Sequence, residues 1–192
     1  KIYELLIDKN NQARIRIEFP KAEIHRRNTG YAIDELLKTQ PFSENGETFN
    51  MCRLLSGSEG TLAFTTKITL QLDDLPPTHS CVVAAHYHSI EACLQSVSRT
   101  MKHNLYTCEM MDKIILDCTK SNLAQAKNRF FVKGDPQAIL LLELRSNSEA
   151  DLAKQTNELI ISLENEGKSY DFPVLKGDEI AKAMELRKAG LG

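Results

Sequence analysis

The sequence predicts an α+β fold, and its second half carries most of the evidence. In residues 77–192, short apolar runs typical of buried strands alternate with longer segments in which apolar residues recur every three or four positions, as in amphipathic helices. Capping residues bound the clearest helix, because Ser148 precedes it and Gly167 ends it. Apart from a helical insert, the order of elements is β-α-β-β-α-β. This order predicts a ferredoxin-like fold, a four-stranded antiparallel sheet with helices on one face.

The expected elements of this half follow one another closely. Strands are expected at Cys81–Tyr87, Leu105–Met111, Ala138–Leu144 and Tyr170–Leu175, and helices at 89–103, 112–131 in two pieces, 148–166 and 178–189. The stretch Asp-Asp-Leu-Pro-Pro at 73–77 is typical of a break, so we expect a domain boundary near Pro76 and Pro77.

The first half of the chain is less regular. Residues 2–6 fit a helical spacing whereas residues 15–19 alternate like a strand, so both structures remain open for 1–19. A short apolar run at Ala32–Leu37 precedes a loop-like stretch at Thr39–Phe49. The run Thr61–Leu72, rich in Thr, Ile and Leu, predicts a strand.

Composition and charge exclude several classes of protein. The 192 residues include 24 Lys and Arg and 26 Asp and Glu, and the resulting net charge of -2 argues against a dedicated nucleic-acid or anionic-membrane binder. No apolar run approaches the roughly 18 residues that span a bilayer, and no signal-peptide pattern is present. The expected location is the cytoplasm, with peripheral association with the inner membrane as the alternative.

The five cysteines show neither a ligand pattern nor a disulfide pattern. They are Cys52, Cys81, Cys93, Cys108 and Cys118. An odd number without a C-x-x-C pair argues against a disulfide framework, a zinc site and an iron–sulfur cluster. We therefore expect reduced, mostly buried thiols.

Residues 56–60, Ser-Gly-Ser-Glu-Gly, form the tightest cluster of small residues in the chain. Two glycines let the backbone turn sharply and present N–H groups to an acceptor, and Ser58 and Thr61 add hydroxyl groups. Such a loop suits an anionic or heteroaromatic ligand, with a tight structural turn as the alternative. Upstream, Arg26 and Arg27 could clamp a phosphate or carboxylate, or lie solvated on the surface.

Together, these two regions resemble one family. The segment Arg-Asn-Thr-Gly-Tyr-Ala-Ile-Asp at 27–34, followed by Leu-Leu-Ser-Gly-Ser-Glu-Gly-Thr-Leu at 54–62, is similar to FAD-linked oxidases of the vanillyl-alcohol-oxidase type. That family includes D-lactate dehydrogenases, the glycolate oxidase flavoprotein subunit and D-2-hydroxyglutarate dehydrogenase. The resemblance continues at Glu109–Asp112, Leu140–Glu143 and Glu185–Leu191.

The resemblance implies two incomplete domains. Residues 1–76 would be the second part of a PCMH-type FAD-binding domain, and residues 77–192 the first part of a substrate-binding cap of the FAD-linked oxidase C-terminal type. The Asn-Ala-Gly-Gly-type loop that binds the FAD pyrophosphate in the family is absent, and so is the downstream His-x-Gly-Asp-Gly-Asn-x-His stretch. Ala63 stands where the family often has Gly. With Lys1 in place of an initiator methionine, we expect an internal fragment, inactive by itself and without stoichiometric FAD.

The resemblance also implies site residues. The residues expected at the FAD are Gly57, Ser58, Glu59, Gly60, Thr61 and Leu62, with Thr29, Gly30 and Tyr31 behind them. Arg187 is expected to bind the carboxylate of a D-2-hydroxy acid, although an exposed Arg near a helix end is equally consistent with its position. No residue stands out as the general base.

The implied reaction is oxidation of lactate, glycolate or 2-hydroxyglutarate to the 2-oxo acid by hydride transfer to FAD. Electrons would then pass to a quinone, an electron-transfer protein or a fused iron–sulfur module, whose ligand cysteines this chain lacks. The alternative is a non-enzymatic ferredoxin-like module that binds a small molecule or a partner protein.

His86 and His88 form the remaining candidate. At positions i and i+2 of a strand they face the same side and could share a metal ion. Because no third ligand lies nearby in the sequence, a pair of strand-end histidines is the favoured interpretation, and we expect no metal site.

Overall fold

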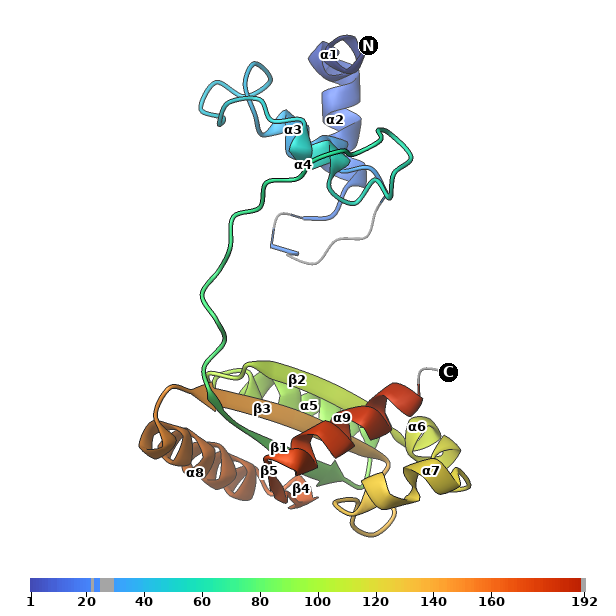
Figure 1. The fold of residues 1–192 in the computed structure, drawn as a ribbon, viewed down its shortest axis with the longest axis vertical. Coiled ribbons are helices and arrows are strands. Elements are labelled where there is room, and N and C mark those ends of the chain that lie inside the picture. Colours follow the sequence, from blue (N-terminus) through green and yellow to red (C-terminus); the bar gives the residue numbers. More distant parts are fainter. Residues whose placement is uncertain (22, 25–29, 191–192) are drawn as a thin grey trace. The chain divides into compact units, whose positions relative to one another are not determined.

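The computed structural model describes residues 1–21, 23–24 and 30–190. The chain divides into two compact units, Lys1–Leu72 and Asp73–Gly192 (Figure 1). Each unit has an apolar core of its own. Within the described residues, no helix combines the length and the apolar character that crossing a membrane requires.

A five-stranded antiparallel sheet forms the centre of the C-terminal unit. Its strands are β1 (His79–Tyr87), β2 (Thr107–Asp112), β3 (Ala138–Ser146), β4 (Ser169–Asp171) and β5 (Val174–Lys176). Their order is β2-β3-β1-β4, and β5 also pairs with β1. The pairing of β1 with β3 runs without interruption from His79 opposite Ser146 to Tyr87 opposite Ala138. The predicted α+β class and the ferredoxin-like strand order are both confirmed.

The last strand is interrupted, where the sequence predicted one continuous strand at Tyr170–Leu175. Pro173 separates β4 from β5, and the register against β1 shifts between His86 and Tyr87. Proline has no N–H group to donate to a neighbouring strand. Its carbonyl oxygen still accepts a hydrogen bond from the Ala84 N–H at 2.9 Å, so this edge of the sheet stays attached to β1.

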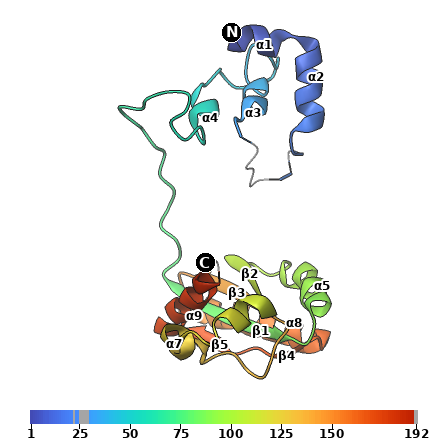
Figure 2. The same cartoon turned by 90° about the vertical axis from the view of Figure 1, so that its right-hand side faces the viewer.

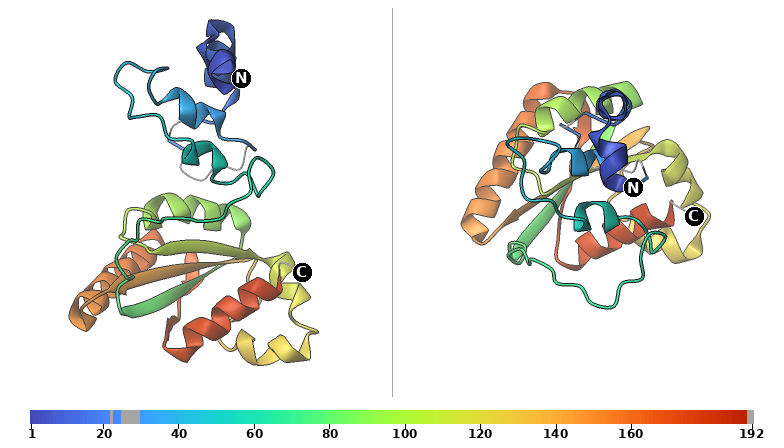
Figure 3. Two further views of the ribbon diagram at one scale, coloured as in Figure 1. Left: turned by 45° about the horizontal axis from the view of Figure 1, so that its top comes forward. Right: turned by 90° about the horizontal axis from the view of Figure 1, so that it is seen from above.

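Helices cover both faces of the sheet, so the expectation of helices on one face was wrong. Helices α5 (Ile90–Thr100) and α8 (Glu149–Glu166) cover one face, while α6 (Lys113–Cys118) and α9 (Asp178–Ala189) cover the other. Figure 2 shows α9 and α5 on opposite sides of the strands, and Figure 3 shows the layers from two further directions.

Alternate residues of the central strands supply these two cores. Cys81, Val83, Ala85 and Tyr87 of β1 pack with α5 and α8, whereas Val82 and Ala84 pack with α6 and α9. Successive strand side chains point to opposite faces, so one uninterrupted apolar strand serves two layers of helices.

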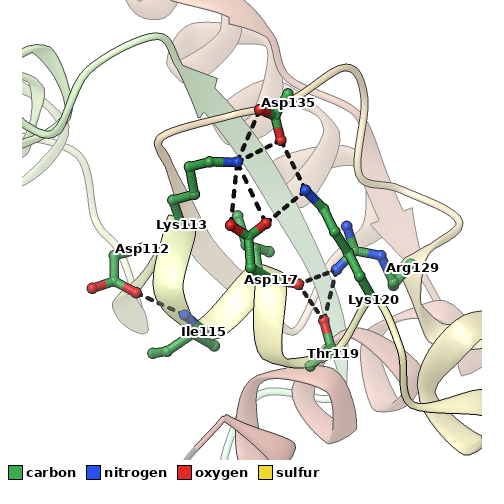
Figure 4. Close-up of polar contacts among 9 residues, drawn as sticks. Asp112, Lys113, Ile115, Asp117, Thr119, Lys120, Arg129 and Asp135 are labelled. Carbon is green, nitrogen blue, oxygen red and sulfur yellow. Dashed lines mark hydrogen bonds and ion pairs between the residues drawn. The ribbon is translucent and has the colours of Figure 1, made fainter.

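The insert between β2 and β3 consists of α6, α7 (Leu123–Ala126) and the 3-10 helix η1 (Lys127–Arg129). Four charged side chains join its two ends (Figure 4). Lys113 Nζ lies 2.7 Å from Asp135 Oδ1 and 3.3 Å from Asp117 Oδ2, and Lys120 Nζ lies 2.6 Å from Asp117 and 3.0 Å from Asp135. The hydrogen bond from Lys120 lowers the pKa of Asp117, and the one from Lys113 lowers that of Asp135. This cluster closes the insert at the protein surface.

The N-terminal unit is helical at its start, which settles the ambiguity of residues 1–19. It contains α1 (Ile2–Ile7), α2 (Lys9–Glu18), α3 (Ile33–Leu37) and α4 (Cys52–Leu55). Asp8 ends α1 and caps α2 by accepting hydrogen bonds from the N–H groups of Asn10 and Asn11. The core of this unit is small, with these buried residues: Leu6, Ile15, Leu36, Leu37 and Leu54.

The strand predicted at Thr61–Leu72 does not form. The segment belongs to no helix or strand, and its apolar side chains are exposed, Phe64 by 92% and Leu70 by 73%. A strand is stabilised by hydrogen bonds to a neighbouring strand and by a covered face. No described residue of this chain pairs with the segment, so the alternating pattern alone does not produce the structure.

Helix α9 ends so close to Ile115 of α6 that the residue after the helix, Gly190, has no room for a side chain. A methyl group at Gly190 would overlap Ile115 Cγ2 and would lie 3.1 Å from Ile115 Cβ. We predict that Gly190→Ala destabilises the C-terminal unit by about 1–3 kcal/mol, the usual cost of overpacking. Urea unfolding followed by circular dichroism measures this change. In an Ile115→Ala background the same substitution should cost much less, and equal costs in the two backgrounds would contradict the packing argument.

Candidate functional site

The small-residue loop at 56–62 adopts an unusual backbone conformation. Three of its residues have positive φ angles: Gly57 at 84°, Glu59 at 52° and Gly60 at 75°. Among the described residues, Glu59 is the only non-glycine residue in this region of backbone space. A side chain there costs roughly 1–2 kcal/mol, so the loop is held in a conformation that its sequence only partly favours.

The same loop presents hydrogen-bond donors. The N–H groups of Gly57, Glu59 and Gly60 donate no hydrogen bond within the described part of the chain. Those of Ser58 and Thr61 close two turns, because they donate to the carbonyl oxygens of Leu55 and Ser58. Neighbouring N–H groups in a glycine-rich turn form a concave donor surface that suits an acceptor-rich ligand. That these donors meet a ligand stays a prediction of the sequence analysis.

A hydrogen bond joins the two motifs that the sequence singled out, although they lie 30 residues apart. The hydroxyl oxygens of Tyr31 and Thr61 are 2.8 Å apart. Thr61 donates its own proton to the Ser58 carbonyl oxygen at 2.6 Å, so Tyr31 is the donor to Thr61. Gly30 precedes this contact with φ at 81°. Thr29, Arg26, Arg27 and Asn28 lie outside the described residues.

Arg187 lies on α9 and forms an ion pair with Glu109 of β2. Its Nη2 atom is 2.6 Å from Glu109 Oε2, and the two side chains are 30% and 34% exposed. Glu109 and Met111 occupy the same face of β2, and that face is covered by α9. Glu109 belongs to a quoted motif, but its pairing with Arg187 could not be found without knowing that α9 covers this face.

His86 and His88, the candidate pair of the sequence analysis, make different contacts. His86 is buried, its Nδ1–H donates to the Ala84 carbonyl oxygen at 2.7 Å, and its Nε2 accepts from the Lys133 N–H at 3.2 Å. His88 instead stacks on the Tyr170 ring at 4.1 Å. Both nitrogen atoms of His86 are therefore engaged with the backbone. Within the described residues, no group of three or more His, Cys, Asp or Glu side chains could hold a metal ion.

The cysteines are unpaired, but fewer are buried than expected. Cys81 and Cys93 are buried and Cys108 is half-buried, whereas Cys52 and Cys118 are exposed. The last two lie on short surface helices, where only one face is covered. Burial raises the pKa of Cys93 to about 12, which keeps this thiol protonated at neutral pH.

Comparison with known proteins places this chain in a family. The family model for FAD linked oxidases, C-terminal domain, matches residues 76–192. The chain belongs to the FAD linked oxidase family. This finding confirms the resemblance that the two motifs indicated.

Named relatives of this FAD linked oxidase chain are longer proteins. It is 25% identical over 163 residues to D-2-hydroxyglutarate dehydrogenase of Haemophilus influenzae, an alignment covering 83% of this chain and 15% of the relative. It is 25% identical over 205 residues to D-2-hydroxyglutarate dehydrogenase of Escherichia coli, covering 100% of this chain and 19% of the relative. D-lactate dehydrogenase of Anaerostipes hadrus is 27% identical over 154 residues, covering 77% of this chain and 32% of the relative. The chain thus spans a third or less of each relative's length.

The environment of His86 predicts a pH-dependent stability. Burial lowers the pKa of His86 below its ordinary value of 6.5, and its hydrogen bond to Ala84 only partly opposes the shift. Below pH 6.5 the unfolded chain takes up a proton at this imidazole before the folded chain does, so stability present above pH 6.5 is lost as the pH falls. Urea midpoints measured between pH 7.5 and 5 should show this loss in the wild type and a smaller one in His86→Gln. His88→Gln is the control, and parallel losses in all three proteins would contradict the role of His86.

Proposed function

We propose that this chain is part of a longer FAD-dependent enzyme that oxidises a D-2-hydroxy acid to the corresponding 2-oxo acid. The match of residues 76–192 to the FAD linked oxidases carries this proposal. Relatives named for D-2-hydroxyglutarate and D-lactate support a substrate of that class. Lactate, 2-hydroxyglutarate and glycolate are the substrates to compare.

Residues 1–76 would supply one wall of the FAD site. The donor set of the loop fits the cofactor, because the free N–H groups of Gly57, Glu59 and Gly60 match the carbonyl oxygens and ring nitrogens of a flavin. Ser58, Thr61 and Leu62 complete the proposed contact surface, and Gly30, Tyr31 and Thr29 would support it from behind. The Tyr31–Thr61 hydrogen bond supports this assignment, since it ties the two motifs into one surface.

Residues 77–192 would bind the substrate. The planar guanidinium of Arg187 can donate two parallel hydrogen bonds to one carboxylate. At 30% exposure it is reachable from solvent while its helix is anchored in the core by Leu186 and Ala183. These properties suit an anchor for the carboxylate of a 2-hydroxy acid.

In this mechanism the protein orients and neutralises the substrate. FAD, when held by the proposed loop, would supply the capacity to take up the hydride that leaves the substrate's alpha carbon. Arg187 fixes the carboxylate and with it the direction of the alpha C–H bond, which is an orientation effect. We assign no general base to this chain. The electron acceptor would be a quinone, an electron-transfer protein or a fused iron–sulfur module, and the described residues favour none of the three.

The loop geometry predicts how a single methyl group affects flavin binding. Gly60 and Gly167 both have positive φ angles and open space around the missing side chain, so alanine at either position carries a similar backbone cost of about 1–2 kcal/mol. In the longer polypeptide, Gly60→Ala should weaken FAD binding several-fold because the loop donors move, while Gly167→Ala should retain it. The flavin absorption of the purified proteins measures this. A wild-type polypeptide without a flavin band would favour the non-enzymatic alternative.

We predict that Arg187→Lys impairs substrate binding and leaves flavin binding unchanged. Lysine keeps the charge but loses the two-pronged geometry, so the KM for the 2-hydroxy acid should rise roughly tenfold, equivalent to about 1.4 kcal/mol. The flavin content should stay at the wild-type level. Anaerobic bleaching of the flavin by D-lactate or D-2-hydroxyglutarate gives both quantities, and unchanged kinetics would refute the role of Arg187.

A further inference from the structure

We propose that Glu109 is the positioning residue for Arg187: it holds the guanidinium in one orientation and leaves the remaining donors free for the substrate carboxylate. This inference rests on the proposed function. It assigns a role to a residue that neither touches the substrate carboxylate nor belongs to the cofactor loop.

The side chains of Arg187 and Glu109 meet through a single pair of atoms. Arg187 Nη2 meets Glu109 Oε2 at 2.6 Å, and the described part of the chain offers the guanidinium no other partner. A guanidinium carries five N–H donors in one plane. One contact fixes its direction, and the donors on the other edges remain available for a second carboxylate.

Both residues of the ion pair lie on elements that are packed into the core. Glu109 lies opposite Leu141 in the β2–β3 pairing, two residues from the buried Met111. Arg187 follows the buried Leu186 on α9, and Gly190, directly after that helix, lies too close to Ile115 for a side chain to fit between them. The long arginine side chain has several rotatable bonds, so its orientation depends on the carboxylate that it meets.

The charge of Glu109 has the opposite effect on an anion. Beside Glu109 the guanidinium is part of a neutral pair, so a ligand carboxylate is attracted less strongly than by an isolated arginine. By orienting the guanidinium, Glu109 therefore favours substrate binding, whereas by neutralising its charge Glu109 opposes it. Two substitutions separate the effects, because Glu109→Gln keeps an oxygen that can accept from Arg187 but removes the charge, whereas Glu109→Ala removes both.

The orientation is tested first, on the 192-residue chain itself. Nitrogen-15 NMR of arginine side chains reports how fast a guanidinium rotates, and the signal of Arg187 is identified by its loss in Arg187→Lys. We expect restricted rotation in the wild type and in Glu109→Gln, and fast rotation in Glu109→Ala. Glu158→Gln is the charge-matched control, because Glu158 is exposed on α8, across the sheet from α9. Equal rotation in the wild type and Glu109→Ala would overturn the proposal.

Substrate binding is tested second, in the longer flavin-containing polypeptide with D-lactate and D-2-hydroxyglutarate. Glu109→Ala should raise KM at least fivefold with a smaller change in kcat, while Glu109→Gln should show a KM equal to or below that of the wild type. The thermal midpoints of the variants confirm that each is folded. Equal KM changes in both variants, or none, would overturn the positioning role. A wild-type enzyme that oxidises neither acid would instead refute the proposed function, and the NMR result would still report on the ion pair.

Discussion

The antiparallel pairing of β1 with β3 is the interaction on which the C-terminal unit depends. Residues 81–87 of β1 and 138–144 of β3 are buried on both faces, so the pair cannot be stable with water on either side. Leaving one face bare would expose side chains such as Val82, Ala84, Ile139 and Leu141. Burial of each of the larger ones, valine, isoleucine and leucine, stabilises the fold by on the order of 1–3 kcal/mol. Two layers of helices are therefore a requirement of these two strands.

This requirement also places the candidate substrate anchor. To cover Val82 and Ala84, α9 must lie along the sheet with Ala183 and Leu186 facing inward. The next residue, Arg187, then reaches the edge strand β2 and meets Glu109. The side chain that we assign to substrate binding is thus positioned by core packing, and its partner comes from a strand far away in the sequence.

Much of this fold could be predicted from local signals. Ser89, Ser148 and Gly167 bound their helices as expected, because caps act through hydrogen bonds within a few residues. The single-face arrangement was wrong although the evidence was present: uninterrupted apolar runs such as Cys81–Tyr87 are typical of strands covered on both faces. The Glu109–Arg187 pair and the unpaired Thr61–Leu72 segment could not be predicted, since both depend on what packs beside a segment and not on its own pattern.

The candidate cofactor loop depends on a different kind of interaction. The N-terminal unit buries few residues, and Leu62 at the end of the loop is 42% exposed, so core packing does not define the loop. Its shape comes from three left-handed residues, from turns closed by Ser58 and Thr61, and from the Tyr31 hydroxyl that donates to Thr61. The turns and the left-handed residues can be recognised in a sequence, because they require particular residues at fixed spacing, whereas the Tyr31–Thr61 hydrogen bond joins residues 30 positions apart. That is why the loop was recognisable from its motif while Glu109, placed by tertiary packing, was recognisable only in the folded structure.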